Sequence, residues 1–312
     1  MSATMAEAPL TERIWDTLEA ALSGGKTPPL RVLFASDDSQ PARAAEEFLT
    51  SAPLAPGSAV RVHTVLDALE WQVPQSLRGA EQEWARRLGE EAEARLRGRG
   101  WQVDHAASRG APADEILKAA DAFKADLVVV GSHGRRGFNR LVLGSVARSV
   151  ANQAALPVLI ARALLYGLRR VVLAVDGSEQ ASRAVLVTGH FPLPPETEIT
   201  VCTVVRPYSP VVGPEYLADV DLIIADVWKE QKKDAERLVT AAADSLARWG
   251  KRVATTVRNG DPGSELLKLA AEQEADLVIV GARGMSPVRA LIVGSVANRL
   301  MNDATCSVLI VH

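Results

Sequence analysis

Short apolar runs alternate with longer amphipathic segments along almost the whole chain. Runs such as 171–175, Val-Val-Leu-Ala-Val, are apolar on both faces, as strands in the middle of a parallel sheet are. The segments between these runs carry apolar residues at helical spacing. Strands that alternate with helices are joined by right-handed crossovers, so the pattern predicts doubly wound α/β domains with helices on both faces of a sheet.

The predicted elements form two sets with the same order. The first set has strands at 31–36, 60–66, 101–107, 126–130 and 157–161, and helices at 41–50, 77–98, 112–123 and 142–153. The second set has strands at 170–175, 198–205, 251–258, 276–280 and 306–311, and helices at 179–188, 222–249, 262–274 and 292–302. Each set therefore predicts a domain with five strands, the first at 30–162 and the second at 169–312.

The two sets are copies of one another at the level of residues. Aligned without a gap, segments 110–160 and 260–310 share 23 identical residues out of 51. Segment 31–37 matches 170–176 at an offset of 139 instead of 150, so the second copy carries 11 extra residues in its middle. This insertion falls near 207–220 and is either a lid over one site or a longer surface excursion. A repeat of this length indicates a duplicated domain and not a solenoid.

Each copy carries a glycine motif directly after its fourth strand. The spacing G-x2-G-x9-G-S falls on Gly131, Gly134, Gly144 and Ser145, and again on Gly281, Gly284, Gly294 and Ser295. A strand, a glycine-rich loop and a helix start with free N–H groups form a cradle for phosphate. The motif predicts two nucleotide sites, or one working site and one relic.

An aspartate ends the first strand of each copy, Asp37 in the first and Asp176 in the second. The carboxyl ends of the central strands are where ligands bind in doubly wound sheets, so each aspartate is expected near its glycine motif. Two plainer interpretations remain open: the aspartates only cap the next helix, and the Gly-Ser pairs only serve packing. Asp38, where the second copy has Gly177, points either at the phosphates or to water.

The motif and its repetition resemble the universal stress protein family. The resemblance covers about 30–161 and 169–312, and it identifies the chain as a tandem member with an ATP-binding type motif in each copy. It implies a sheet of five parallel strands in the order 3-2-1-4-5 for each domain. It further implies an ATP site without a Walker motif.

The resemblance implies a role for each matching residue. In the first domain Asp37 would hold the adenosine end, Val65 would offer backbone contacts to adenine, and Gly131 and Gly134 would let the loop wrap ribose and phosphates. Gly144 and Ser145 would present N–H groups and a hydroxyl to the phosphates. In the second domain the same roles fall to Asp176, Val204, Gly281, Gly284, Gly294 and Ser295. ATP is the expected ligand, with AMP and ADP as alternatives and Mg²⁺ accompanying the phosphates.

Composition and charge narrow the function classes. The formal net charge of −3 and the absence of a long basic run give no case for nucleic-acid binding. No stretch reaches the ~18 apolar residues of a membrane span, and the N-terminus has no signal-peptide pattern, which predicts a cytoplasmic protein. Cys202 and Cys306 lie in apolar runs and are expected to be buried hydrophobes.

The segment before the repeat is interpreted separately. Leu10, Ile14, Leu18 and Leu22 recur every four residues, which predicts a short amphipathic helix within the N-terminal extension 1–29. That helix either docks on the domain surface or binds a partner. The nearby triplet Gly25-Lys26-Thr27 is no phosphate loop, because such a loop follows a strand and opens a helix.

These observations favour a nucleotide-responsive stress regulator. The alternatives are a slow ATPase or nucleotide-dependent phosphotransferase, and a nucleotide-free interaction scaffold. No catalytic or metal-ligating set is apparent, so a dedicated enzyme is not expected, and ATP hydrolysis would be weak at most. Family subunits often pair through their fifth strands, and here 158–160 and 308–310 are apolar. We hypothesise an internal pseudo-dimer of the two domains, further association into a homodimer, and protein partners whose identity is open.

Overall fold

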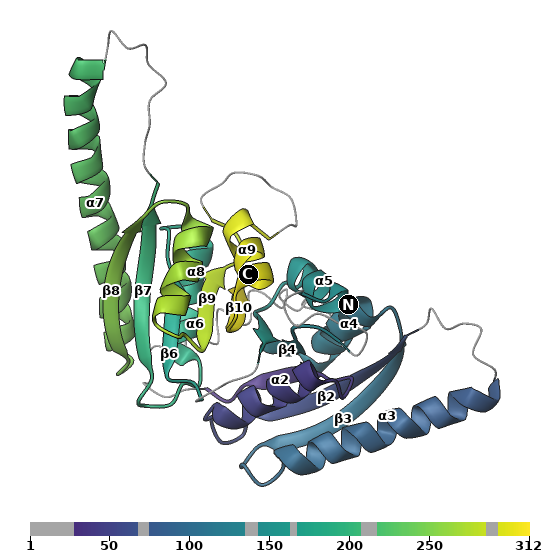
Figure 1. Ribbon diagram of the computed structural model, residues 1–312. Helices are drawn as coiled ribbons and strands as arrows, with labels where there is room; N and C mark the ends of the chain where they lie inside the picture. Colours follow the sequence, from purple (N-terminus) through teal and green to yellow (C-terminus); the bar gives the residue numbers. More distant parts are fainter. Residues whose placement is uncertain (1–27, 68–74, 135–142, 163–166, 207–216, 285–292) are drawn as a thin grey trace, which may run out of the picture.

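A single ten-stranded sheet runs through the molecule (Figure 1), with the strand order β3-β2-β1-β4-β5-β10-β9-β6-β7-β8. The computed structural model describes residues 28–67, 75–134, 143–162, 167–206, 217–284 and 293–312. The first copy supplies β1 (Arg31–Ala35), β2 (Ala59–Asp67), β3 (Gln102–Gly110), β4 (Leu127–Gly131) and β5 (Val158–Ala161). The second supplies β6 (Arg170–Ala174), β7 (Glu198–Val205), β8 (Arg252–Asn259), β9 (Leu277–Gly281) and β10 (Ser307–Val311). Each half is parallel in the order 3-2-1-4-5, which confirms the predicted fold.

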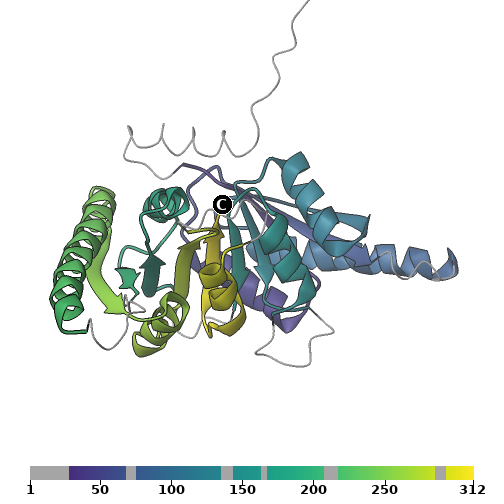
Figure 2. The same cartoon turned by 90° about the horizontal axis from the view of Figure 1, so that it is seen from above.

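Helices cover both faces of the sheet (Figure 2). The first half has α2 (Gln40–Ser51), α3 (Gln75–Leu96), α4 (Pro112–Phe123) and α5 (Ser145–Gln153). The second half has α6 (Glu179–His190), α7 (Leu217–Ala247), α8 (Pro262–Glu272) and α9 (Ser295–Asp303). Because the winding reverses after the third strand of each half, α2 and α3 lie on one face of their sheet and α4 and α5 on the other.

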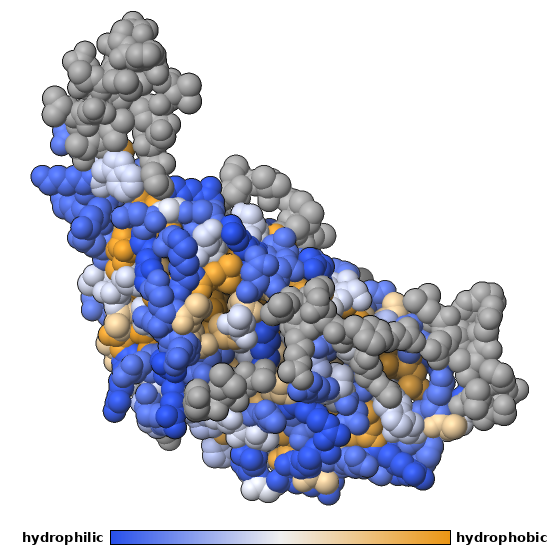
Figure 3. Space-filling view, viewed as in Figure 1, coloured by the Kyte–Doolittle hydropathy of each residue, from blue (hydrophilic) through white to orange (hydrophobic). Residues whose placement is uncertain are grey.

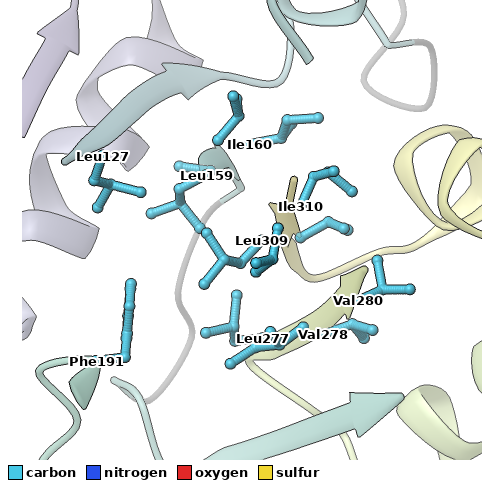
Figure 4. Packing of buried hydrophobic residues seen from close by; sticks show 14 of the residues in the cluster. Leu127, Leu159, Ile160, Phe191, Leu277, Val278, Val280, Leu309 and Ile310 are labelled. Atoms are coloured by element: carbon cyan, nitrogen blue, oxygen red, sulfur yellow. The ribbon is translucent and has the colours of Figure 1, made fainter. Parts of the chain in front are cut away.

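The two halves join through their last strands. β5 and β10 pair antiparallel, with Leu159 directly opposite Leu309, and this pairing confirms the predicted association of the fifth strands. Figure 4 shows the leucines of both strands among the side chains of β9, and both leucines are fully buried. A second contact lies between α2 and the end of α6, where the rings of Phe48 and Phe191 meet edge to face at 6.3 Å.

The strands and helices predicted for the two copies all exist, with shifted ends. β3 runs on to Gly110, three residues beyond the predicted end at 107, and α7 begins at Leu217 instead of 222. The predicted helix within 1–29 and most of the insertion at 207–220 lie outside the described residues. Over the described residues the face in Figure 3 is mainly hydrophilic, and no described helix is long and apolar enough to cross a membrane.

We expect the domain junction to carry a large share of the stability. Leu159→Ala and Leu309→Ala should each lower the free energy of unfolding by about 2–5 kcal/mol, because each leaves a cavity in a fully buried layer. The double variant should lose less than the sum of the two, since the leucines face each other. Urea denaturation measures all three, with the exposed Val227→Ala as a control that should change little. Strict additivity at 159 and 309 would contradict the direct contact.

Candidate nucleotide sites

The aspartate and the first two motif glycines of each domain lie at the carboxyl ends of two adjacent strands. Asp37 follows β1, and Gly131 ends the neighbouring β4. A Cβ atom placed on Gly134 would lie 2.9 Å from Asp37 Oδ2, so the aspartate and the second motif glycine touch. Asp176 and Gly284 meet in the same way in the second domain. The structure therefore brings together residues that are about 100 positions apart in each copy.

One carboxylate oxygen of each aspartate is bound by the turn that follows it. The N–H of Ser39 donates to Asp37 Oδ1 at 3.1 Å, and the N–H of Ser178 donates to Asp176 Oδ1 at 3.0 Å. The serine hydroxyls in turn cap α2 and α6 by accepting from Ala42 N and Ala181 N. The serines are thus the helix caps, while the turn directs Oδ2 of each aspartate toward the glycine loop.

The residue after each aspartate has a left-handed backbone. Gly177 has φ of 81°, and Asp38 occupies the same position of the first copy with φ of 59°. Asp tolerates this conformation better than most residues but less well than Gly. The Asp38 carboxylate lies 2.8 Å from Arg43 Nη2, and both side chains are partly exposed. Asp38 therefore faces Arg43 at the surface, which decides between the two orientations left open by the sequence.

The first glycine of each motif is required by packing. A Cβ atom on Gly131 would lie 2.7 Å from the carbonyl carbon of Pro41, at the start of α2. In the second domain a Cβ on Gly281 would lie 2.9 Å from Gln180 in α6. Since both clashes involve backbone atoms, these two glycines are explained by the approach of a helix to the strand end, with or without a ligand.

The third glycine of each motif is the N-cap of a helix. The N–H of Gly144 donates to the Ser132 carbonyl at 2.8 Å, and the N–H of Gly294 donates to the Ala282 carbonyl at 2.7 Å. Each of these N–H groups is thus bonded to a carbonyl that directly follows β4 or β9, and the role toward phosphate expected of Gly144 and Gly294 stays a prediction. The N–H groups that follow, beginning with Ser145 and Ser295, have no partner within their helices.

The starts of α5 and α9 differ from those of the other helices. Six helices have N-caps that the structure describes. Among these six, only α5 and α9 share two features: the N-cap makes no side-chain hydrogen bond, and the first turn has no acidic residue. The others are capped by Ser39, Ser178 or Asp261, or carry Asp114 and Glu115 in the first turn. The positive ends of α5 and α9 are therefore not offset by such a group of the protein itself.

Val65 and Val204 lie where a strand outruns its neighbour. His63 is the last residue of β2 paired with β1, and Val65 stands two residues beyond it, paired with β3 only. Val204 stands two residues beyond Cys202, the last residue of β7 paired with β6. On the side that faces β1 or β6, where the candidate site lies, the backbone groups of both valines therefore extend beyond the last paired residue.

Two residues before each of these valines lies a buried side chain, His63 in the first domain and Cys202 in the second. The buried His63 imidazole places Nε2 3.0 Å from Ser108 Oγ, and burial lowers the pKa of His63, which keeps the ring neutral at pH 7. In the second domain burial raises the pKa of the Cys202 thiol to about 12, so it stays protonated. Both cysteines are buried free thiols, as expected.

The two loops also differ in chemistry. In the first, Ser132 Oγ lies 3.2 Å from His133 Nδ1, whereas the second has Ala282 and Arg283 at these positions. No group of three or more His, Cys, Asp or Glu side chains that could hold a metal ion occurs among the described residues. Both sites share two features: an aspartate beside the second motif glycine, and a helix start with neither a side-chain cap nor an acidic first turn.

A model of the universal stress protein family matches residues 30–162 and 167–312. The chain belongs to the universal stress protein family. It holds two such domains in tandem, as the repeat predicts.

Individual proteins are similar to one domain of the chain or to both. Universal stress protein YxiE of Bacillus subtilis is 29% identical over 147 residues, which are 46% of this chain and 98% of that protein. The crystal structure of a universal stress protein from Archaeoglobus fulgidus covers 90% of this chain and 97% of its own, with 20% identity and a TM-score of 0.63. A universal stress protein solved in complex with cAMP matches 46% of this chain with 23% identity and a TM-score of 0.31.

The packing of the first glycine can be tested without any ligand. Gly131→Ala should lower the free energy of unfolding by about 1–3 kcal/mol, because its Cβ overlaps the backbone of α2. Gly79→Ala is the control: it lies in α3 with no heavy atom within 4 Å of the added Cβ and should stabilise by about 0.5–1 kcal/mol. Thermal unfolding of the nucleotide-free chain measures both. A neutral Gly131→Ala would show that the loop does not need glycine for packing.

Proposed function

We propose that this universal stress protein binds one molecule of ATP in each domain and acts as a nucleotide-responsive stress regulator. The observation that carries the proposal is the start of α5 and α9, which have neither a side-chain cap nor an acidic first turn. Phosphate groups would supply the negative charge that such a helix end attracts. The same arrangement in both domains supports two sites.

The proposed roles follow the geometry of each site. The N–H groups and hydroxyls of Ser145 and Ser295 would hold the phosphates. The Oδ2 atoms of Asp37 and Asp176, which face the glycine loops, would accept hydrogen bonds from the ribose hydroxyls. The backbone of Val65 and Val204 would contact adenine. The motif glycines would shape the loop, Gly131 and Gly281 against the helix and Gly134 and Gly284 against the aspartate.

Magnesium fits this proposal as a companion of the nucleotide. Mg²⁺ is usually held by phosphate oxygens and water with one or two carboxylates, and not by an all-protein cage. The described residues hold no acidic cluster of their own for it, so the cation would arrive with ATP. Its chemical contribution would be to offset the charge of the phosphates.

Regulation would follow from linkage between nucleotide and conformation. A ligand shifts a protein toward a conformation only as far as it binds that conformation better. Here ATP would contact the strand end, the glycine loop and the helix start together, so occupancy would favour the arrangement in which all three converge. A partner that recognises this arrangement would then respond to the nucleotide.

A charge placed at the helix start tests the proposal with two opposite effects. Ser295 is exposed at the first position of α9, so Ser295→Glu should stabilise the helix by about 0.3–1 kcal/mol. The same carboxylate should weaken binding of MgATP to the second site by about tenfold, because it repels the phosphates. Ser145→Glu should do the same in the first domain. Calorimetric titration gives affinities and stoichiometry, and thermal unfolding gives stability.

The neutral variants Ser145→Gln and Ser295→Gln are the matched controls, and they should bind MgATP much more tightly than the glutamate variants. The parent chain should bind two nucleotides with unequal affinity, since the loops differ at His133 and Arg283. A stoichiometry clearly below two would contradict the two-site proposal. Glutamate variants that bind as tightly as the parent chain would contradict the phosphate role of both helices. Multiple-turnover phosphate release by the parent would instead favour the slow ATPase.

A further inference from the structure

We propose that Arg162 of the first domain is a positioning residue for the nucleotide site of the second domain. This inference rests on the proposed function, because the helix that Arg162 holds is the one proposed to bind phosphate. The second site is then complete only when the first domain is docked against it. Nucleotide affinity in one domain would thereby report on the junction between the two.

Arg162 lies directly after β5 and reaches across the junction to the far end of α9. Its Nη2 donates to the carbonyl of Met301 at 2.6 Å, and its Nη1 donates to the carbonyl of Cys306 at 3.1 Å. Its backbone N–H donates to Ser307 Oγ at 3.0 Å, and that hydroxyl donates back to the Arg162 carbonyl. The side chain and the backbone of one residue are thus both fixed to the second domain.

The charge of Arg162 suits this position. The last carbonyls of a helix lack intrahelical partners and carry partial negative charge, which a cation at the C-terminus offsets. Both side-chain hydrogen bonds go to backbone carbonyls, and burial lowers the pKa of Arg162 from its ordinary value. A guanidinium nevertheless stays charged in proteins, so the contact is a charge-assisted one.

A second arginine of the first domain holds the same helix end. Arg148, in α5, donates from Nη2 to Asn302 Oδ1 of α9 at 2.7 Å. α9 has nine residues and is about 13 Å long, so its two ends are joined by little more than two turns of helix. Its first residue stands at the proposed phosphate site and its last turn is held by two side chains of the other domain. A shift at the held end would therefore displace the N–H groups at the other.

The reciprocal contact is weaker. His312 follows β10 as Arg162 follows β5, 150 positions earlier, and it interacts with the backbone of Ala151 in α5. Burial, together with Arg283, lowers the pKa of His312 to about 4, so the imidazole is neutral at pH 7. Its Nε2 is buried without a partner among the described residues. A neutral ring holds a helix C-terminus less firmly than a guanidinium, so the dependence runs mainly from the first domain to the second site.

The experiment measures each site by itself in the full chain. Ser145→Glu leaves the second site as the main site, and Ser295→Glu leaves the first. In the Ser145→Glu background, Arg162→Met should weaken MgATP binding about tenfold, the loss expected for hydrogen bonds from a charged group. Arg162→Lys should restore part of the affinity, because an ammonium still offsets the helix end. In the Ser295→Glu background, Arg162→Met should change affinity less than about twofold.

Two further variants keep the test sharp. Arg170→Met removes an arginine whose guanidinium is paired with Glu274, which lies outside α9 and both candidate sites, so it should leave both sites unchanged. Asn302→Ala removes the second tether, together with the hydrogen bonds from Asn302 Nδ2 to Asn298 within α9, and should weaken the second site about two- to threefold even if Arg162→Met folds poorly. Thermal unfolding is recorded for every variant.

The outcomes separate the two levels of the proposal. Equal weakening of both sites by Arg162→Met, or a lowered melting temperature with unchanged affinity at the second site, would overturn the positioning role and leave nucleotide binding intact. No binding of MgATP by the parent chain would overturn the proposed function, and the positioning role would fall with it. Loss confined to the second site, with partial rescue by lysine, is the expected result.

Discussion

The antiparallel pairing of β5 with β10 is the contact on which the arrangement of the whole molecule depends. Both strands are buried along their length and, apart from Ser307, apolar, so neither could stand at the edge of a separate domain without exposing a flat hydrophobic strand. Because the two strands pair with each other, neither edge is exposed. It also relates the domains by an approximate twofold axis, because each fifth strand faces the other in the opposite direction.

The same pairing brings the two short helices together. α5 precedes β5 and α9 precedes β10, so the axis between the strands also sets the helices side by side, with Arg148 touching Asn302. Each helix begins at the glycine loop of its own domain. Each ends beside a residue that follows the fifth strand of the other domain. The tandem arrangement therefore provides two candidate sites and also connects them structurally.

The fold could be predicted from the sequence because its signals are local and repeated. Three signals can be recognised without knowledge of distant contacts: the apolar runs of the buried strands, the spacing of the glycines, and the 150-residue offset between the copies. The association through the fifth strands followed from their apolar composition once the family resemblance was recognised. Helix ends shifted where a loop with little periodicity borders the helix, as at the start of α7.

The details of the sites were less predictable, because they depend on pairs that are remote in sequence. Nothing local shows that Asp38 turns to Arg43, or that the N–H of Gly144 is taken by Ser132. The hydrogen bonds from the Arg162 side chain to the second domain could not be predicted for the same reason. Its partners lie more than 130 residues away and are backbone carbonyls, which do not depend on residue type. The residue type shows where a side-chain carboxylate or hydroxyl is, whereas every residue has a backbone carbonyl.

Packing and ligand binding make different demands on the glycine motif, and the structure allows them to be separated. Contact with α2 and α6 accounts for Gly131 and Gly281 without any ligand. It does not account for the starts of α5 and α9, where a carboxylate in the first turn would stabilise the helix by about 0.3–1 kcal/mol and neither copy has one. The neighbouring helices α4 and α8 do carry such acids. This stabilisation, unused at the same place in both domains, is the observation on which the proposed phosphate sites rest.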